Sequence, residues 1–224
     1  MGDYVYLWLA AAFGAVWGVY FFLRRDLRRK LVFSSAASFF LGFTEPIFIP
    51  AYWIPQFKAI PLGKELFLES LLFCGVLGGF CACSYQVAAG KGLFPLRRIH
   101  PALTLAAPAV FLLVYLPGGT EVPVNIAYFS GGAMALGTGT LIGALGREAA
   151  RPILLTGLAA TLIYGAIYSV FWAAFPSLRA SYQFVNFSGL AIAAIPVEEF
   201  VWIAAFAIYW APLYEIWRGR FPRL

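Results

Sequence analysis

Charged residues are scarce in this sequence. Only 12% of its 224 residues are Asp, Glu, Lys or Arg and 62% are hydrophobic, whereas soluble domains average about 25% charged and about 45–50% apolar residues. The apolar runs also recur too closely to form a soluble core beside a single membrane anchor. The composition therefore predicts an integral membrane protein built as one compact helical bundle.

Metal-binding motifs are also missing. The single histidine, His100, stands at a predicted helix start and is better explained as an interfacial residue than as a ligand or catalyst. The two aspartates, Asp3 and Asp26, cannot supply the paired Asp-rich magnesium motifs of a prenyltransferase. The cysteines fall in one predicted helix without a CxxC pattern or a nearby histidine: Cys74, Cys81 and Cys83. They support neither a zinc site nor a disulfide framework, so we predict no metal.

Three other classes of function lack their usual signatures. The last apolar run contains no lysine that could form a Schiff base, which argues against a retinal-binding pump. No GxGxxG motif followed by a soluble βαβ unit is present, and we predict that the protein uses no cofactor. No basic face is interleaved with exposed aromatic residues, so nucleic acid is not expected as a partner.

Seven apolar segments are long enough to cross a bilayer, which takes about 20 residues of helix. They are residues 3–23, 31–50, 66–88, 101–117, 124–145, 152–175 and 197–217. Unpaired backbone polar groups are not tolerated in lipid, so each segment should be an α-helix. We predict an all-α fold with seven transmembrane helices. The first segment lacks the basic leader and the cleavage site of a signal peptide, so we expect it to stay as the first helix.

The basic residues are distributed unequally between the two sides of this bundle. Thirteen follow the first, third, fifth and last segments: Arg24, Arg25, Arg28, Arg29, Lys30, Lys91, Arg97, Arg98, Arg147, Arg151, Arg218, Arg220 and Arg223. Three lie on the other side: Lys58, Lys64 and Arg179. The positive-inside rule then predicts a multi-pass protein of the cell membrane, with the N-terminus outside and the C-terminus cytoplasmic.

Two stretches of the chain resemble each other. Three residues recur 129 positions later: Glu69, Phe73 and Tyr85 match Glu198, Trp202 and Tyr214. Three more recur 122 positions later: Arg25, Asp26 and Arg29 match Arg147, Glu148 and Arg151. The pattern predicts two parallel three-helix repeats, residues 1–99 and 124–224, joined by a linker helix within 100–123.

Carboxyl groups inside these spans are the candidate functional groups. A charged side chain at the centre of a membrane helix costs about 2.5–3.5 kcal/mol on insertion scales, so such acids face the protein interior and are usually functional. Glu69, Glu198 and Glu199 stand near predicted helix starts, and Glu45 is a fourth acid in the second segment. We expect Glu69 and Glu198 to face each other across one cavity that is open sideways to lipid.

Aromatic residues accompany these acids. At helical spacing, two of them share a face with Glu69 and two with Glu198: Phe73 and Phe80, and Trp202 and Tyr209. The aromatic stretches 50–61, which includes Trp53, and 182–195 fit interface belts, with a lid over an outer site as the alternative. We predict that Glu45, Trp53, Phe73, Phe80, Trp202 and Tyr209 bind substrate.

An uncharged carboxyl in an aromatic pocket can act as a general acid, a neighbouring carboxylate can act as a base, and aromatic faces attract cations. This combination suits proton-initiated isomerisation of a hydrophobic alkene. Two alternatives stay open: the acids join the two repeats by hydrogen bonds, or they carry protons or ions in a small transporter.

The motif Pro196-Val197-Glu198-Glu199-Phe200, with Trp202 and Tyr214, carries a resemblance to a known family. The same holds for Glu69 to Phe73 with Tyr85, for Tyr52-Trp53 and for the basic end of the first helix. Together they resemble the membrane-embedded, flavin-independent lycopene cyclase domain family.

The resemblance implies closure of a β-type ring at the end of an acyclic carotenoid taken from the bilayer, with Glu69, Glu198 and Glu199 as catalytic residues. It is also compatible with association with other enzymes of the carotenoid pathway. One residue departs from the pattern: Ser70 stands where first repeats of the family often carry a second acid.

Overall fold

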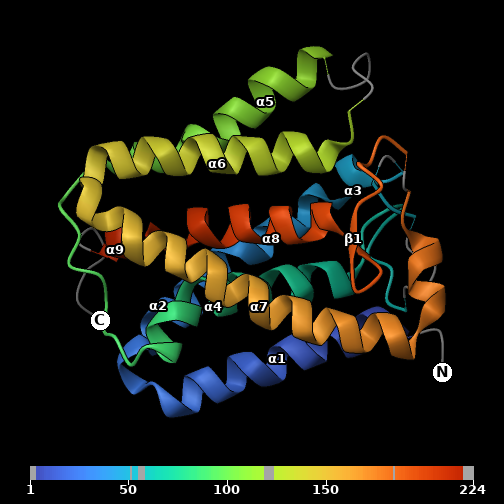
Figure 1. Ribbon diagram of the computed structural model, residues 1–224, viewed down its shortest axis with the longest axis horizontal. Helices are drawn as coiled ribbons and strands as arrows, with labels where there is room; N and C mark the ends of the chain where they lie inside the picture. Colours follow the sequence, from blue (N-terminus) through green and yellow to red (C-terminus); the bar gives the residue numbers. More distant parts are fainter. Residues whose placement is uncertain (1–3, 51, 55–58, 119–123, 184, 219–224) are drawn as a thin grey trace.

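The computed structural model describes residues 4–50, 52–54, 59–118, 124–183 and 185–218. Within these ranges it is a bundle of helices with one short hairpin, drawn in Figure 1. The all-α prediction is therefore confirmed at the level of fold class. Four charged residues considered above lie outside the described ranges, as do parts of the stretches 50–61 and 182–195: Asp3, Lys58, Arg220 and Arg223.

The described residues of the first half of the chain form four α-helices and two short 3-10 helices. They are α1 (Val5–Leu23), η2 (Arg25–Leu27), α2 (Arg28–Phe39), η3 (Phe40–Thr44), α3 (Glu45–Phe48) and α4 (Leu68–Ala88). The second predicted segment is thus not one regular helix, because η3 tightens the backbone between α2 and α3. This turn carries Glu45 at the start of α3, followed by Pro46, which is tolerated in the first turn of a helix.

The described residues of the second half form five α-helices, three 3-10 helices and the hairpin. They are η4 (Pro101–Leu105), α5 (Ala106–Gly118), α6 (Ile126–Leu145), η5 (Arg147–Ala149), α7 (Ala150–Ala174), η6 (Pro176–Ser181), β1 (Ala191–Ile192), β2 (Ile195–Pro196), α8 (Val197–Trp210) and α9 (Leu213–Trp217). The hairpin directly precedes α8, pairing Ile192 with Ile195, and so fixes where that helix begins.

Five helical stretches of the described chain are long and apolar enough to cross a membrane: Val5–Leu23, Arg25–Phe48, Leu68–Ala88, Arg147–Ala174 and Val197–Trp217. These are the helices of a multi-pass membrane protein. The other two predicted segments are also helical. Pro101–Leu116 is shorter, and five of the twenty residues of α6 are glycine, which lowers its hydropathy.

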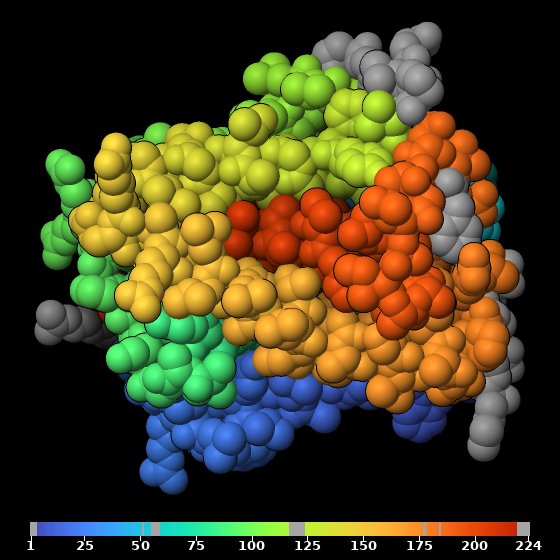
Figure 2. Space-filling view, viewed as in Figure 1, coloured from blue at the N-terminus to red at the C-terminus, as the bar shows by residue number. Residues whose placement is uncertain are grey.

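α4 and α8 occupy matching places in the two halves of the bundle. α4 packs against α1 and α2, α8 packs against α6 and α7, and α4 and α8 also contact each other (Figure 1). Close approach of α4 to α2 depends on Gly78, where a methyl group would lie 2.8 Å from the carbonyl oxygen of Ser34. On one face of the molecule α8 is visible between α6 and α7 (Figure 2), and Val201 is exposed.

The end of the bundle where α1, α4, α6 and α9 finish is held by buried polar contacts. Lys30 donates from Nζ to Glu215 Oε1 at 2.8 Å and to the carbonyl oxygen of Ala211 at 2.7 Å. Glu215 Oε1 also accepts from Gln86 Nε2 and from the backbone N–H of Phe94, each at 3.3 Å. These bonds join α2, α4, α9 and the connection after α4.

At the other end of the bundle the outer aromatic stretches pair with each other. Trp53 and Tyr182 form an antiparallel bridge, which is extended by hydrogen bonds from Ile54 N to Ser181 O and from Gln183 N to Tyr52 O. Trp53 and Tyr182 are 129 residues apart, and so are Gln86 and Glu215 at the opposite end. The two paired stretches therefore close the end of the bundle above the starts of α4 and α8.

Candidate functional site

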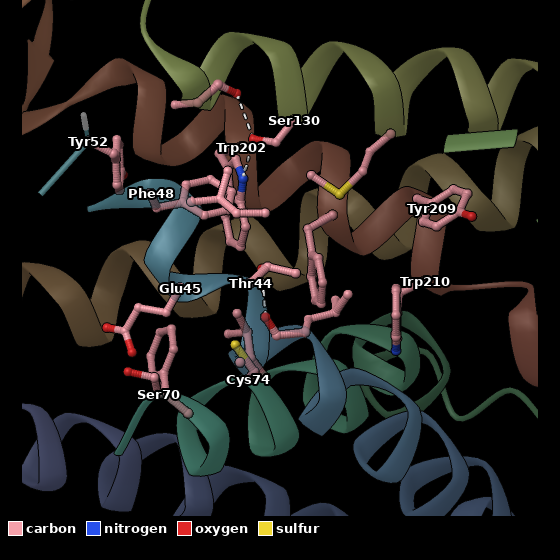
Figure 3. A pocket seen from close by; sticks show the side chains of 18 of the residues that line it. Thr44, Glu45, Phe48, Tyr52, Ser70, Cys74, Ser130, Trp202, Tyr209 and Trp210 are labelled. Carbon is pink, nitrogen blue, oxygen red and sulfur yellow. Dashed lines mark hydrogen bonds between the residues drawn. The ribbon is translucent and has the colours of Figure 1, made fainter. Parts of the chain in front are cut away.

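A cavity of about 530 Å³ lies inside the bundle, within the range of about 300–1,000 Å³ typical of small-molecule sites. α1, η3, α3, α4, η4, α5, α6, α7 and α8 all contribute to its lining. Figure 3 shows Glu45 and Tyr52 towards one end and Tyr209 and Trp210 towards the other. The cavity thus extends along α8 rather than across the bundle.

Three carboxyl groups line this cavity: Glu45 from α3, Glu69 from α4 and Glu199 from α8. All three are buried, with at most 6% of each residue exposed. The lining residues that the structure describes include no Lys, Arg or His. A negative charge here would lack a cation to compensate it, which is costly away from water.

Glu199 stands in the first turn of α8 and points into the bundle. Its Oε2 accepts a hydrogen bond of 2.8 Å from the hydroxyl of Tyr164 on α7. Its Oε1 is buried without a hydrogen-bond partner in the described structure. One oxygen is therefore held by the protein, and the other is available to a molecule in the cavity.

Glu69 has a different set of partners. Its Oε1 accepts from the backbone N–H groups of Ala59 and Ile60, at 2.7 and 3.0 Å. Its Oε2 is buried and has no partner among the described residues. Glu69 thus anchors the segment before α4 through one oxygen while it contributes to the cavity lining.

Glu198 does not line the cavity, contrary to the predicted pairing of Glu69 with Glu198 across it. It accepts hydrogen bonds from the backbone N–H of Ser188, at 2.6 Å, and from the hydroxyl of Tyr128 on α6. Adjacent helical residues differ by about 100° in direction, so Glu198 and Glu199 cannot share one face. Glu199 takes the place predicted for Glu198.

Four of the aromatic residues predicted to bind substrate line the cavity: Trp53, Phe73, Trp202 and Tyr209. Phe80 does not, because its ring is fully buried against Phe13 and Tyr20 of α1, at centroid distances of 5.6 and 6.2 Å. The helical wheel placed Phe80 on the face of Glu69 but could not show that α1 covers this turn of α4.

A ladder of stacked rings forms one wall of the cavity. Trp202, Phe206 and Trp210 follow each other at intervals of one helical turn on α8, with centroid distances of 5.4 and 5.0 Å and interplanar angles of 10° and 13°. Trp202 Nε1 donates to Ser130 Oγ at 3.0 Å, as Figure 3 shows. Since the indole is held by this bond, the ladder presents fixed aromatic surface to a ligand.

A cluster of buried tyrosines, which was not predicted from the sequence, lies beside Glu199. Tyr164 and Tyr168 stack on α7 with centroids 4.9 Å apart, and the hydroxyls of Tyr168 and Tyr182 share a hydrogen bond. Burial raises the pKa of Tyr182 well above its ordinary value. The four-residue spacing of Tyr164, Tyr168 and Trp172 within an apolar segment was the available signal.

Part of the cavity lining from η3, α3 and α5 reaches the surface of the bundle. Leu41, Ile47 and Leu112 line the cavity, and each is at least 36% exposed. These side chains are all aliphatic, so this rim would contact lipid chains if the bundle is embedded in a membrane.

No protein-family model, curated protein or solved structure matches this chain. A functional assignment therefore rests on the geometry of the cavity and on the motif resemblance of Pro196 to Phe200. Across the described residues, no group of three or more His, Cys, Asp or Glu side chains is placed to hold a metal ion.

Proposed function

We propose that this protein is a membrane-embedded isomerase that closes a β-type ring at the end of an acyclic carotenoid such as lycopene. The observation that carries the proposal is the aromatic cavity, which holds Glu45, Glu69 and Glu199 and has no cationic side chain in its described lining. Its aliphatic rim suits a substrate that arrives from lipid. The resemblance in sequence motifs points to the same chemistry.

The proposed membrane arrangement has seven spans, with α5 and α6 as the fourth and fifth. The C-terminal ends of α1, α4, α6 and α9 lie together in Figure 1, so the connections rich in Lys and Arg gather at one end of the bundle. That end is cytoplasmic by the positive-inside rule. The opposite end, which is covered by the paired stretches around Trp53 and Tyr182 and is called the outer strap below, then lies outside. This orientation places the proposed site in the outer half of the membrane.

We also propose that residues 1–99 and 124–224 are two copies of one repeat, joined by a linker helix within 100–123. The contacts Trp53–Tyr182 and Gln86–Glu215 support this, because residues that correspond in two parallel repeats meet where a two-fold axis passes between them. Glu69 and Glu198 support it as well, since each accepts the backbone N–H of the residue ten positions earlier.

In the proposed reaction Glu199 is the acid. Its carboxyl proton passes to the terminal double bond of the polyene, which leaves a tertiary cation that the neighbouring internal double bond attacks to close a six-membered ring. The aromatic ladder of Trp202, Phe206 and Trp210 lies along the cavity wall, where ring faces stabilise positive charge.

A second carboxyl completes the reaction by removing a proton from the cyclic cation. Glu69 fits this role through Oε2, which has no partner in the described structure, and Glu45 is the other carboxyl on the cavity wall. The position of the base decides which ring isomer forms. One proton enters and one leaves, so formula and redox state are unchanged and the stoichiometry requires no cofactor. Glu198 has a structural role in this proposal, because it bonds the start of α8 to the preceding loop and does not contact substrate.

The test is expression of the chain in a host that accumulates lycopene, followed by chromatography of the pigments. Cyclic products are expected with the intact chain and with Glu65→Gln, a control at an exposed position outside the cavity. They should be lost with Glu199→Gln. If the intact chain is inserted in the membrane and lycopene stays acyclic, this function is refuted.

A proton- or ion-coupled transporter is the second candidate. The ion pair between Lys30 and Glu215 supports it, because this pair closes the end of the bundle opposite the strap, as a closed inner gate would. Purified protein in liposomes should then move protons or sodium ions in a way that depends on Glu199, while pigment composition in the lycopene host stays unchanged.

A further inference from the structure

We propose that Tyr164, Tyr168 and Tyr182 form a hydroxyl relay that restores the proton of Glu199 after each turnover. The inference rests on the proposed function, in which Glu199 gives its proton to the substrate. These residues are distinct from the acid and the base, and act by proton transfer to Glu199 rather than by contact with the reacting carbons.

The first link joins the relay to the acid. Tyr164 O–H donates directly to Glu199 Oε2 at 2.8 Å, and both residues are buried, at 3% exposure each. When Glu199 loses its proton to a substrate at Oε1, Tyr164 is the hydroxyl already bonded to the resulting carboxylate. Tyr164 can pass its proton to Glu199 along this bond if Tyr168 supplies it with another.

The second link leads away from the cavity acid. Tyr168 stands one turn after Tyr164 on α7, and their rings stack with an interplanar angle of 13°, which puts both hydroxyls on one side of the helix. The hydroxyl of Tyr168 in turn shares a hydrogen bond with the hydroxyl of Tyr182. Hydrogen bonds thus join Glu199 to Tyr164 and Tyr168 to Tyr182, and ring stacking places Tyr164 beside Tyr168 between them.

The relay ends beneath the outer strap. Tyr182 pairs with Trp53 in the bridge that closes this end of the bundle, and its ring meets that of Tyr52 at a centroid distance of 5.6 Å. Its raised pKa keeps the hydroxyl protonated, as a member of a relay must be between transfers. The outer end of the bundle is therefore where protons would enter.

Protons balance over a cycle. Each hydroxyl accepts one proton on its oxygen and gives up its own to the next group, so every tyrosine ends neutral. Glu199 gains the proton that it gave to the alkene, while the base releases the one taken from the cyclic cation. No proton is consumed, and no oxidant or reductant is involved.

Infrared spectroscopy of the purified, reconstituted protein tests the relay without substrate. The carbonyl band of protonated Glu199 is identified by its loss in Glu199→Gln, and its shift is then followed after transfer into heavy water. The relay predicts that Tyr168→Phe slows this exchange roughly tenfold or more, since one hydroxyl of the chain is gone. Tyr182→Phe should slow the exchange at Glu199 similarly. Agreement between the two variants would show that the effect does not come from a folding defect in one of them.

The matched control is Tyr20→Phe. Tyr20 is also buried and also loses a hydroxyl bond, to Ser84 Oγ at 3.4 Å, but it does not line the cavity. The carboxyl proton of Glu199 should exchange at the same rate in Tyr20→Phe as in the intact protein. Equal rates in Tyr168→Phe and the intact protein, or the absence of a protonated Glu199 band, would overturn the relay.

Turnover measurements separate the relay from the proposed function. With enzyme in excess over lycopene, the first ring should form at the normal rate in Tyr168→Phe, because Glu199 begins protonated, while multiple turnovers slow. An equal slowing of both phases would show a structural role and contradict the relay. If neither the intact protein nor any variant cyclises lycopene, but hydrogen exchange at Glu199 still slows in Tyr168→Phe, the relay holds and the cyclase proposal fails.

Discussion

Glu199 and Glu215 are two buried glutamates at opposite ends of the last helical stretch, and they differ in what surrounds them. Glu215 is paired with Lys30 and accepts two further hydrogen bonds, whereas Glu199 has the hydroxyl of Tyr164 beside it and a cavity in front. In the first half of the chain the matching positions, 129 residues earlier, are neutral: Ser70 and Gln86.

The difference shows how one scaffold separates two uses of a buried acid. A carboxylate that is paired with a cation and accepts further hydrogen bonds is fixed in charge and geometry, so it holds helices together. A carboxyl with no cation near it and an unpartnered oxygen beside a cavity can exchange its proton with a ligand. Since Ser70 and Gln86 carry no charge, only the second half has a carboxyl at both of these matched positions.

The strongest test of this comparison is Glu199→Gln. The amide keeps the size of the side chain and can still accept from Tyr164, but it cannot give a proton, so cyclisation should fall by about 10²–10⁴-fold. Pigment chromatography in the lycopene-producing host measures the loss. Cyclisation at the normal level, with the protein correctly inserted, would remove Glu199 from the chemistry.

At the C-terminal end of the last helical stretch, Lys30→Met leaves Glu215 buried without its cation. Breaking a buried ion pair in this way typically costs about 3–5 kcal/mol, so the thermal midpoint of the detergent-solubilised protein should drop sharply. The double variant Lys30→Met/Glu215→Leu removes both charges and should recover most of the loss. If the single and double variants melt alike, the pair does not secure this end.

Glu198→Gln and Glu69→Gln compare the two loop-anchoring glutamates. Both variants weaken a bond to the preceding segment, but only Glu69 also lines the cavity. We expect Glu69→Gln to lose cyclisation by roughly 10²-fold or more as the base. Glu198→Gln should lose about tenfold or less, the effect of one weakened hydrogen bond. Product yield normalised to protein in the membrane distinguishes them, and the reverse order would return catalysis to Glu198.

Tyr128→Phe should have the smallest effect. It removes the hydroxyl bond to Glu198 and leaves the bond from Ser188 N, so about 1 kcal/mol of stability should be lost. Thermal unfolding and pigment yield together measure it, with near-normal product expected. A loss of cyclisation as large as that in Glu199→Gln would mean that Tyr128 and Glu198 act in the chemistry.

Much of the fold was predictable because membrane helices obey simple rules. Apolar stretches of sufficient length must be helical, and each predicted segment does contain helix. The count of spans was less certain: five stretches satisfy both length and hydropathy, while the glycines of α6 and the short Pro101–Leu116 helix weaken the other two. The break at η3 was not predicted, although Pro46 has no N–H to bond the carbonyl of Gly42 and so offered a local signal.

The site was predictable in its residue types but not in its assignments. Amino-acid sequence alone identified buried acids with aromatic neighbours, because an acid in an apolar segment needs an interior partner. It could not choose between Glu198 and Glu199, which differ by one step on the helix, nor show that α1 covers Phe80. Tyr164 was missed because its partner on another helix is 35 residues away.

The sequence by itself determined the membrane class, the helical segments and the two matched glutamate motifs, since each follows from local composition and spacing. Only the tertiary structure decided which carboxyl faces the cavity, which one is paired with Lys30, and which hydroxyl bonds Glu199. These outcomes depend on the rotation of α8 against α6 and α7. That rotation is set by packing between residues far apart in the chain, which no local pattern contains.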